Sequence, residues 1–361
     1  MNRIKADSEK LSQIMKTIGQ CLNRKTGIYS NVQLIHESGT LTVRATNGVF
    51  LGEMSMQVLG EENEIFCVDG DMFSRVINLC KGMIEIISDG KNCVIKGMGR
   101  TRLPIINTTV KAPEDLNGST VKMKAENFKA THSIISYAIS TDASRMVLTG
   151  VLTETDGTEM KMVALNGFQT AIEKTACSGD EVSMIIPGAF MNLISASVGS
   201  ADELQLITNK KIIQAKTASM TLQCALLSGQ YPDYSRLLPS TYETELIIDK
   251  DQITDVLKSS MVVNNKLGTV KISIDSDELT VTNNSEIADF EAKVPCDTHG
   301  KRMMVAFNDH YILDAVNAIR ADQLMMKFNT PVTPVLIQGK DMNGIHICMP
   351  VRLHEVIENN E

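Results

Sequence analysis

The chain contains 361 residues, about two to three times the length of a usual compact domain, which predicts several domains and excludes a small disulfide-stapled scaffold. Hydrophobic residues make up 43% and charged residues 22% of the sequence, as is typical of a folded globular protein, so a mainly disordered chain is excluded. The net charge of -8 arises in the last third, because residues 1–118 carry 14 basic and 13 acidic side chains, 119–240 carry 10 and 11, and 241–361 carry 11 and 19.

The first third shows the patterns of a helix, a hairpin, a second helix and further strands. Apolar residues at helical spacing predict a helix near its start, and polar and apolar residues alternate at 32–47, as in a sheet with one wet face. A second helix is predicted at 71–82 and a strand at 92–96. The apolar positions are Leu11, Ile14, Met15, Ile18 and Leu22 in the first helix, Leu41, Val43 and Ala45 in the hairpin, and Phe73, Val76, Ile77 and Cys80 in the second helix.

The middle and last thirds repeat this succession. In the middle third a hairpin is predicted within 147–167 and a helix at 187–198, with Pro187 suited to the first turn. In the last third the second helix is predicted at 308–320 and a closing strand at 335–339. The first helices carry Phe128, Ile134, Ile135, Ala138 and Ile139 in the middle third, and Ile253, Val256, Leu257 and Met261 in the last.

The succession reflects an internal sequence repeat. Residues 32–47 align without a gap to the segment that begins at Val270, and 147–167 supplies the copy between them. Three units of roughly 119 residues therefore fill the chain, with predicted boundaries at 1–118, 119–240 and 241–361, where turn residues and proline gather. Two helices on one face of an antiparallel sheet, three times over, make an α+β fold.

Motifs for catalysis, metal binding and membrane insertion are missing from the sequence. It has no phosphate-binding glycine-rich loop and no Gly-x-Ser-x-Gly motif, its six histidines are isolated, and its eight cysteines form no Cys-x-x-Cys pair. We expect reduced thiols, no metal and no cofactor; an enzyme is disfavoured but not excluded, since catalytic groups distant in sequence leave no spacing to read. No apolar run approaches the ~18 residues of a membrane helix, and the charged N-terminal segment is no signal peptide, so a cytoplasmic protein is expected.

Four runs of residues, in this order and spread along the chain, carry a family resemblance. They are Ser144-Arg145-Met146-Val147-Leu148-Thr149-Gly150-Val151-Leu152, Val163-Ala164-Leu165-Asn166-Gly167, Tyr231-Pro232-Asp233-Tyr234-Ser235-Arg236-Leu237-Leu238-Pro239 and Met349-Pro350-Val351-Arg352-Leu353. Together with the threefold repeat, they make the sequence similar to the bacterial sliding clamps, the beta subunits of DNA polymerase III.

The resemblance implies a DNA polymerase processivity factor. In that family two three-domain chains join head to tail and close a six-domain ring around duplex DNA. A closed ring cannot leave DNA sideways, so contacts without sequence preference suffice, and an acidic protein can make them if its cations gather on one face. The side chains expected to face DNA are Lys10, Arg24, Lys25, Arg75 and Arg145, with Gln13, Thr17, Gln20 and Asn78 on the same helix faces. The alternative is that these are ordinary solvated helix faces.

The resemblance also implies a hydrophobic groove between the second and third domains, into which the replicative polymerase, the clamp loader and other proteins insert a short peptide. For Leu148 and Ile347 a position in the core remains a strong alternative. Carried over by position, the groove comprises Arg145, Val147, Leu148, Leu165, Gly167, Phe168, Gln169, Thr170, Pro232, Leu237, Pro334, Ile347, Met349, Pro350, Val351, Arg352 and Leu353.

The resemblance implies a dimer contact as well. There, Leu103 and Ile105 of one chain would meet Met261 and Val262 of the next.

The sequence departs from the family pattern in two places. Residues 166–170 read Asn-Gly-Phe-Gln-Thr where the family commonly has Asp-Gly-His-Arg-Leu, so one groove wall loses a cation and gains an aromatic ring. An acidic extension, 354–361, follows the usual terminus and either is a disordered end or partly covers the groove. Two other functions remain open: a clamp-like scaffold that binds partner peptides without encircling DNA, and, less favoured, a hydrolase.

Overall fold

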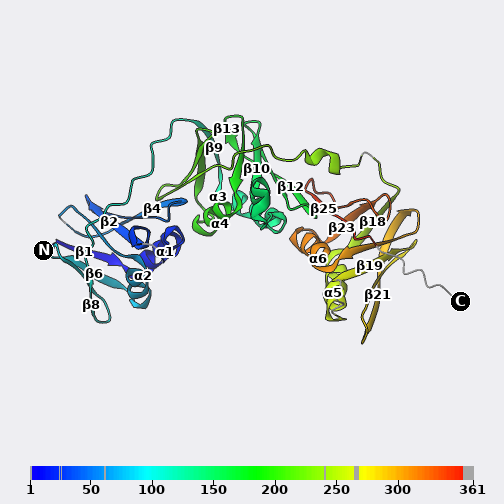
Figure 1. Cartoon of the computed structure of the whole chain (residues 1–361), viewed down its shortest axis with the longest axis horizontal. Helices are drawn as coiled ribbons and strands as arrows, with labels where there is room; N and C mark the ends of the chain where they lie inside the picture. Colours follow the sequence, from blue (N-terminus) through cyan, green and yellow to red (C-terminus); the bar gives the residue numbers. More distant parts are fainter. Residues whose placement is uncertain are drawn as a thin grey trace. The chain divides into compact units, whose positions relative to one another are not determined.

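We describe a computed structural model of the chain (Figure 1). The chain divides into two compact units, the first made of 1–129, 156–158 and 177–227 and the second of 130–155, 159–176 and 228–361. No helix among the described residues combines the length and the apolar composition needed to cross a bilayer. The structure describes residues 2–23, 25, 27–60, 62–239, 241–263 and 268–352.

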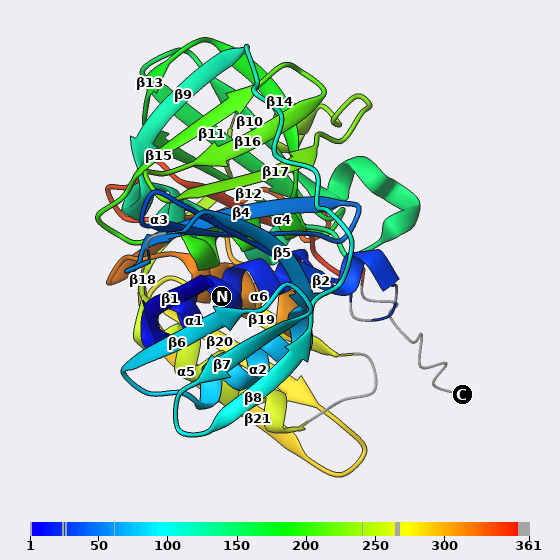
Figure 2. The ribbon, with the colours of Figure 1, turned by 90° about the vertical axis from the view of Figure 1, so that its left-hand side faces the viewer.

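Two antiparallel sheets form the first unit. The smaller sheet has the strand order β1-β6-β7-β8, seen side by side in Figure 2, and the larger has the order β13-β9-β15-β16-β17-β4-β3-β2-β5. The helices of this unit are α1 (Ser8–Ile18), α2 (Gly70–Leu79) and α4 (Gly188–Ser197), and α3 (Ala125–Ile135) begins in it. The strands are β1 (Asn2–Asp7), β2 (Asn31–Glu37), β3 (Thr40–Thr46), β4 (Phe50–Gln57), β5 (Glu64–Asp69), β6 (Met83–Ser88), β7 (Asn92–Lys96), β8 (Arg100–Pro104), β9 (Ser119–Lys124), β13 (Ser178–Gly179), β14 (Val182–Pro187), β15 (Glu203–Thr208), β16 (Ile212–Lys216) and β17 (Met220–Ala225).

One long antiparallel series of strands organises the second unit, in the order β10-β11-β12-β25-β24-β23-β18-β21-β20-β19-β22. Helices α5 (Lys250–Ser260) and α6 (Asp309–Ala318) pack on each other and on this sheet, around a core that includes Leu257, Phe307 and Phe328. The strands are β10 (Gly150–Thr155), β11 (Glu159–Leu165), β12 (Gln169–Ala176), β18 (Thr244–Asp249), β19 (Thr269–Ile274), β20 (Glu278–Asn284), β21 (Asp289–Gly300), β22 (Met303–Asn308), β23 (Gln323–Phe328), β24 (Val335–Gly339) and β25 (Ile345–Cys348).

A repeated junction explains where most helices begin. Strands β1, β5, β18 and β22 each end in Asp or Asn, and that side chain accepts hydrogen bonds from the first free N–H groups of the helix that follows. Such N-caps stabilise a helix by about 1 kcal/mol each. The predicted succession of helices and antiparallel strands in an α+β fold is confirmed, because this strand-to-helix unit recurs along the chain. The capping residues are Asp7, Asp69, Asp249 and Asn308.

Some predicted helix boundaries are wrong. Pro187 does not lie in the first turn of α4 but ends β14 and stands at the N-cap with φ −53° and ψ 131°, where it offers no side-chain hydrogen bond. Helix α2 ends at Leu79 rather than at Gly82, because Cys80 returns to extended backbone and Gly82 takes φ +65° in the turn that leads to β6. Leu22 lies beyond α1 and its 3-10 continuation.

Candidate functional site

The turn between β11 and β12 presents Phe168 at the surface of the second unit. Asn166 Oδ1 accepts hydrogen bonds from the backbone N–H groups of Phe168 (2.9 Å) and Gln169 (2.8 Å). Gly167 between them takes φ +97°, which favours glycine. The Phe168 side chain is 50% exposed, and its ring stacks on Tyr311 of α6 with 5.3 Å between the centroids. The turn therefore holds an aromatic side chain at the surface.

Arg145 packs against the same turn. Its Nη2 donates to the carbonyl oxygen of Asn166 (3.3 Å), and its Nε pairs with Asp142 Oδ2 (3.0 Å). Hydrogen bonds from Ser144 and from Arg145 lower the pKa of Asp142, which keeps the pair charged. A Cβ atom on Gly167 would lie 2.7 Å from Arg145 Nη1, so the guanidinium occupies the space that any larger residue would need. The cation thus borders the aromatic surface.

The segment after β25 joins this turn to β22. The backbone N–H of Met349 donates to the Phe168 carbonyl (2.8 Å), and that of Val351 donates to the Ala306 carbonyl (2.7 Å). Pro350 forms an isolated antiparallel bridge with Phe307. Phe168 follows the second sequence run directly, and the Tyr231 hydroxyl donates to the Val163 carbonyl (3.2 Å). All four runs that carry the family resemblance therefore meet at β11 or at the turn after it, within one unit.

The predicted groove residues divide into a buried support and an exposed lining. Leu148 and Ile347 are buried, in agreement with the core alternative. Gln169 is also buried, and its Nε2 donates to the Tyr311 carbonyl (3.0 Å), so it orients the aromatic pair. Leu353 lies outside the described residues. Leu165 and Thr170 are buried as well; Val147, Leu237, Pro334, Met349 and Pro350 are partly buried; Arg145, Gly167, Phe168, Pro232, Val351 and Arg352 are exposed.

Sequence reasoning missed two residues at this surface. Tyr311 carries the ring on which Phe168 stacks, and Met146 is 62% exposed next to Arg145. Tyr311 falls inside the predicted helix at 308–320, where an aromatic residue near the apolar face is normally assigned to the core. Only the pairing of α6 with the distant turn reveals its position. A predicted wall of the groove is therefore an aromatic pair rather than one aromatic side chain.

On the first unit, basic side chains of α1 line a cleft of about 410 Å³. Lys10 and Lys16 are exposed, and among the described residues neither has an ion-pair partner. The cleft also takes in Gln13 of α1 and the chain after α4, and its described lining includes no Asp or Glu. Lys16 was not among the predicted side chains. The positive charge of this face is thus open to an external anion.

The other predicted DNA-facing residues differ in their surroundings. Arg75 on α2 is exposed but pairs with Asp71 one turn earlier (2.7 Å), which neutralises part of its charge within the helix. Lys25 is exposed, and Arg24 lies outside the described residues. The placement of Thr17 on the polar face of α1 is wrong: it is 5% exposed, because α1 packs on both α2 and α4 and buries a wider stripe than predicted.

The four predicted dimer-contact residues are unequally accessible. Val262 is 84% exposed and Met261 is partly buried, whereas Leu103 is only 5% exposed and Ile105 is partly buried. A further apolar surface beside β8 was not predicted: exposed Leu79 and Met98 help to line a pocket of about 280 Å³.

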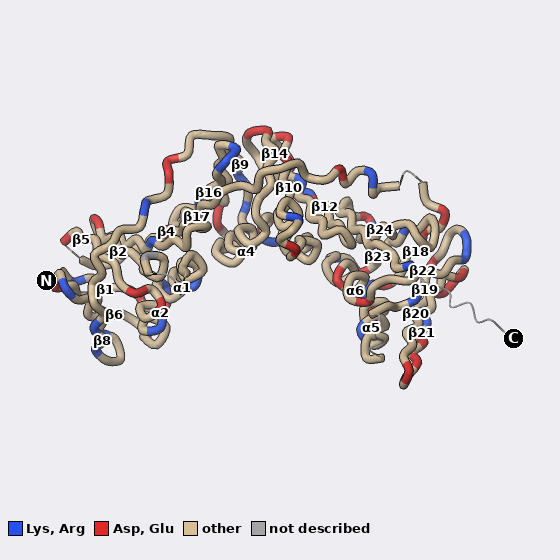
Figure 3. Tube along the Cα trace, viewed as in Figure 1, with Lys and Arg blue, Asp and Glu red and all other residues tan. Residues whose placement is uncertain are grey.

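In the second unit, acidic residues lie along the hairpin that β20 and β21 form (Figure 3). They include Glu286, Asp289 and Glu291.

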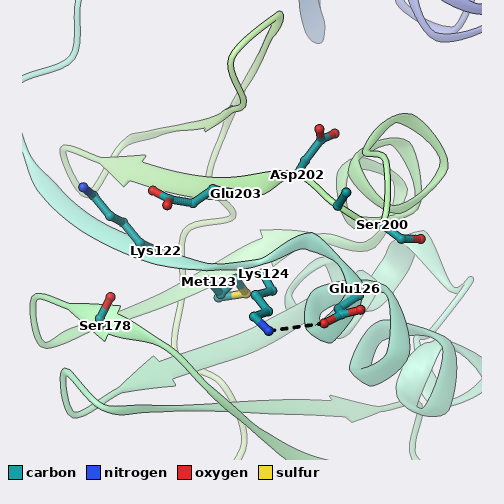
Figure 4. Close-up of a pocket in the computed structure, with 9 residues that line it drawn as sticks. Lys122, Met123, Lys124, Glu126, Ser178, Ser200, Asp202 and Glu203 are labelled. Carbon is teal, nitrogen blue, oxygen red and sulfur yellow. Dashed lines mark ion pairs between the residues drawn. The ribbon is translucent and has the colours of Figure 1, made fainter.

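A further pocket of the first unit, drawn in Figure 4, carries both signs of charge. Its volume is about 520 Å³. Lys124 pairs with Glu126 at 3.7 Å and stands opposite Glu203 on β15, while Asp202 accepts a hydrogen bond from the Gly199 N–H (2.7 Å). Charges that are already matched give no poised acid or base. We assign no function to this pocket.

Comparison with known protein families identifies two consecutive domains. Residues 122–233 match the DNA polymerase III beta subunit, central domain, and residues 235–352 match the DNA polymerase III beta subunit, C-terminal domain. Together these ranges cover well over half of the chain.

Curated relatives and solved structures give the same picture. The beta sliding clamp of Pseudomonas aeruginosa is 23% identical over 347 residues, covering 90% of this chain and 92% of that protein, and that of Escherichia coli is 24% identical over 298 residues, covering 77% and 80%. The crystal structure of the DNA polymerase III beta subunit from Thermotoga maritima aligns with a TM-score of 0.91 at 18% identity, covering 98% of this chain and 100% of the other. At that identity the structural likeness establishes the fold.

Proposed function

The chain belongs to the DNA polymerase III beta subunit family of sliding clamps, which are polymerase processivity factors, and from this membership we propose that two copies join head to tail in a ring around duplex DNA. In this ring the three predicted domains, 1–118, 119–240 and 241–361, would each supply two helices to the inner face. The role is one of topology and binding rather than catalysis. The replicative polymerase, the clamp loader and other proteins are the expected partners, held at the groove.

The observation that carries the peptide-binding part of this proposal is the stack of half-exposed Phe168 on Tyr311, with Arg145 held against the same turn. An apolar anchor that enters a fixed, partly desolvated pocket supplies most of the affinity of a short peptide. Backbone hydrogen bonds fix this surface before any partner arrives, which lowers the ordering cost of binding.

Retention on DNA tests the ring directly. The chain, loaded on nicked circular DNA, is expected to remain bound during gel filtration and to be lost once the circle is cut to linear form. A monomer at micromolar concentration that is never retained on the circle would instead favour the scaffold that binds peptides without encircling DNA.

The basic face of α1 yields a prediction about salt. The double variant Lys10→Ala, Lys16→Ala is expected to weaken binding to a short duplex and to reduce the slope of log K against log salt by about 1 for each phosphate that is no longer neutralised. Arg75→Ala is the matched control, because Asp71 already neutralises part of its charge, so it should change the slope less. Fluorescence anisotropy over a salt series measures both. Equal slopes for the wild type and the double variant would show that Lys10 and Lys16 of α1 do not contact DNA phosphates.

The extension 354–361 yields a second prediction. It carries three glutamates, so it adds negative charge directly after the groove residues Val351 and Arg352. A chain that ends at Leu353 is expected to bind a labelled partner peptide with a different affinity from the full chain. Superimposable titration curves for the two chains would show that the extension has no part in peptide binding.

A further inference from the structure

A pocket of the first unit, separate from the basic face of α1, is lined by oxygen-bearing side chains. It lies where β1 begins, β5 begins and β6 turns into β7, and its volume is about 360 Å³. No Lys, Arg or His is among the described residues that line it. The lining residues are Asn2, Glu62, Asn63, Glu64, Ser88, Asp89 and Gly90.

Asn2 contributes a buried oxygen without a partner. The residue is 7% exposed, and its Nδ2 donates to the Glu62 carbonyl at 2.7 Å. A carbonyl only accepts, so this bond fixes which end of the carboxamide is nitrogen. Oδ1 is consequently the other end, where it is buried and receives no hydrogen bond from the described residues. Leaving such a group buried and unsatisfied destabilises the folded chain, and a bound ligand would offset that cost.

Glu64 contributes a second buried oxygen without a partner among the described residues. Its Oε1 accepts from the Ser88 hydroxyl at 2.5 Å, while its Oε2 is buried and has no partner among the described residues. His36 makes no hydrogen bond to Glu64 Oε2. Its Nδ1 contacts the Glu62 carbonyl at 2.7 Å, and its ring lies against Gly60. The Glu62 carbonyl therefore receives both Asn2 and His36, and the two oxygens without a partner among the described residues, Asn2 Oδ1 and Glu64 Oε2, are buried atoms of residues that line the pocket.

Asp89 adds a second carboxylate to the lining of the pocket. Its Oδ1 accepts from the backbone N–H groups of Lys91 (2.9 Å) and Asn92 (2.6 Å) in the β6–β7 turn. Asp89 Oδ1 is thus committed to the turn, and Oδ2, which accepts a longer hydrogen bond from Asn92 Nδ2 (3.3 Å), is the oxygen that a ligand would contact.

We propose that this pocket binds a divalent cation, Ca²⁺ in preference to Mg²⁺, through Asn2 Oδ1 and the carboxylates of Glu64 and Asp89. Hard cations prefer oxygen ligands, and Ca²⁺ accepts six to eight of them in irregular geometry, as a mixture of amide and carboxylate oxygens with water provides. Mg²⁺ demands a near-ideal octahedron, which this mixture does not offer. Among the described residues no group of three or more His, Cys, Asp or Glu is arranged to hold a metal, so the amide oxygen and water are essential to the site.

The ion would join the two sheets of the first unit. Asn2 lies on β1, an edge strand of the smaller sheet, and Glu64 lies on β5, an edge strand of the larger one. Ser88 pairs with Asn2 across β1 and β6 and also holds Glu64, so the three strands already meet at this point. Calcium is therefore expected to stabilise the first unit against unfolding, because it binds the folded arrangement and not the separated strands.

Calorimetric titration of the full chain with CaCl₂ tests the proposal, with MgCl₂ as the second arm. The expected Kd for Ca²⁺ is about 10⁻⁴ M, since only two carboxylates contribute. Glu64→Gln and Asp89→Asn keep the hydrogen bonds to Ser88 and to the turn but remove one charge each, so both should weaken Ca²⁺ binding about tenfold or more. Melting temperatures should rise with Ca²⁺ for the wild type and much less for these variants.

Glu85→Gln is the matched control. Glu85 lies on the same strand, β6, but faces Arg3, Lys5 and Lys96 and does not line the pocket, so its loss changes the net charge equally and should leave Ca²⁺ affinity unchanged. Circular dichroism without added metal checks that each variant is folded. Two results would overturn the proposal: no heat and no thermal shift with Ca²⁺ in the wild type, or equal Ca²⁺ affinity in the wild type, Glu64→Gln and Asp89→Asn.

Discussion

If the proposed dimer forms, replacing Val262 with aspartate is expected to convert it into a monomer and to abolish retention on nicked circular DNA. Val262 follows α5 and is 84% exposed in the single chain, so the substitution removes no packing and should leave the fold intact. In the proposed ring this side chain is covered by the first domain of the next copy. A carboxylate buried there without a partner would cost several kcal/mol at each of the two junctions.

Sedimentation equilibrium of the full chain at micromolar concentration gives the mass. Val332→Asp is a suitable control, since Val332 is 57% exposed in the same unit and lies outside the predicted contact. Met98→Asp probes the apolar pocket beside β8 on the first unit, which would face Val262 of the next copy in the proposed ring. It is expected to lower the fraction of dimer, as Val262→Asp does. If Val262→Asp retains the dimer mass and the DNA retention of the wild type, the head-to-tail contact does not run through this residue.

Local patterns in the sequence were sufficient for much of the fold because the starts of α1, α2, α5 and α6 are encoded within a few residues. Asp7, Asp69, Asp249 and Asn308 end a strand and cap the next helix with their own side chains, so strand, cap and helix can be read together. The predicted starts at Pro187 and at Asn308 each fall on the N-cap residue, one position before the helix, whether or not that residue has a capping side chain. The sequence pattern therefore locates the junction but does not separate the cap from the first helical residue.

The candidate sites depended more on tertiary contacts. Thr17 is polar at a position that helical spacing assigns to solvent, yet α1 lies between two other helices and buries it. Tyr311 and Phe168 are 143 positions apart, and no periodicity within either element indicates that their rings stack. The sequence also could not predict the unpaired oxygens of Asn2 and Glu64. They are recognised only because none of the described residues donates a hydrogen bond to them in the folded chain.

The second large effect is expected at the groove, from Phe168→Ala. The ring is half exposed and lies against Tyr311, so its loss removes apolar contact area for a peptide anchor while the Asn166 turn, whose hydrogen bonds use backbone N–H groups, stays formed. An aromatic hot spot of this kind contributes about 2 kcal/mol or more, which corresponds to roughly a 30-fold weaker Kd. Titration of a fluorescent peptide with a leucine or phenylalanine anchor measures it.

The variants Phe168→Tyr and Phe168→His distinguish the contribution of the aromatic area from that of the polarity of the ring. Tyrosine keeps the stacking area on Tyr311 and should bind the peptide within a few-fold of the wild type. Histidine restores the residue common in the family; with a smaller and more polar ring it should fall between the wild type and Phe168→Ala, and it should shift preference away from purely apolar anchors. A peptide Kd that is the same in all four proteins would show that the anchor does not contact residue 168, and the departure at 166–170 would then leave partner choice unaffected. Graded loss in the order tyrosine, histidine, alanine would instead tie partner choice to the aromatic area that this chain has added to the groove wall.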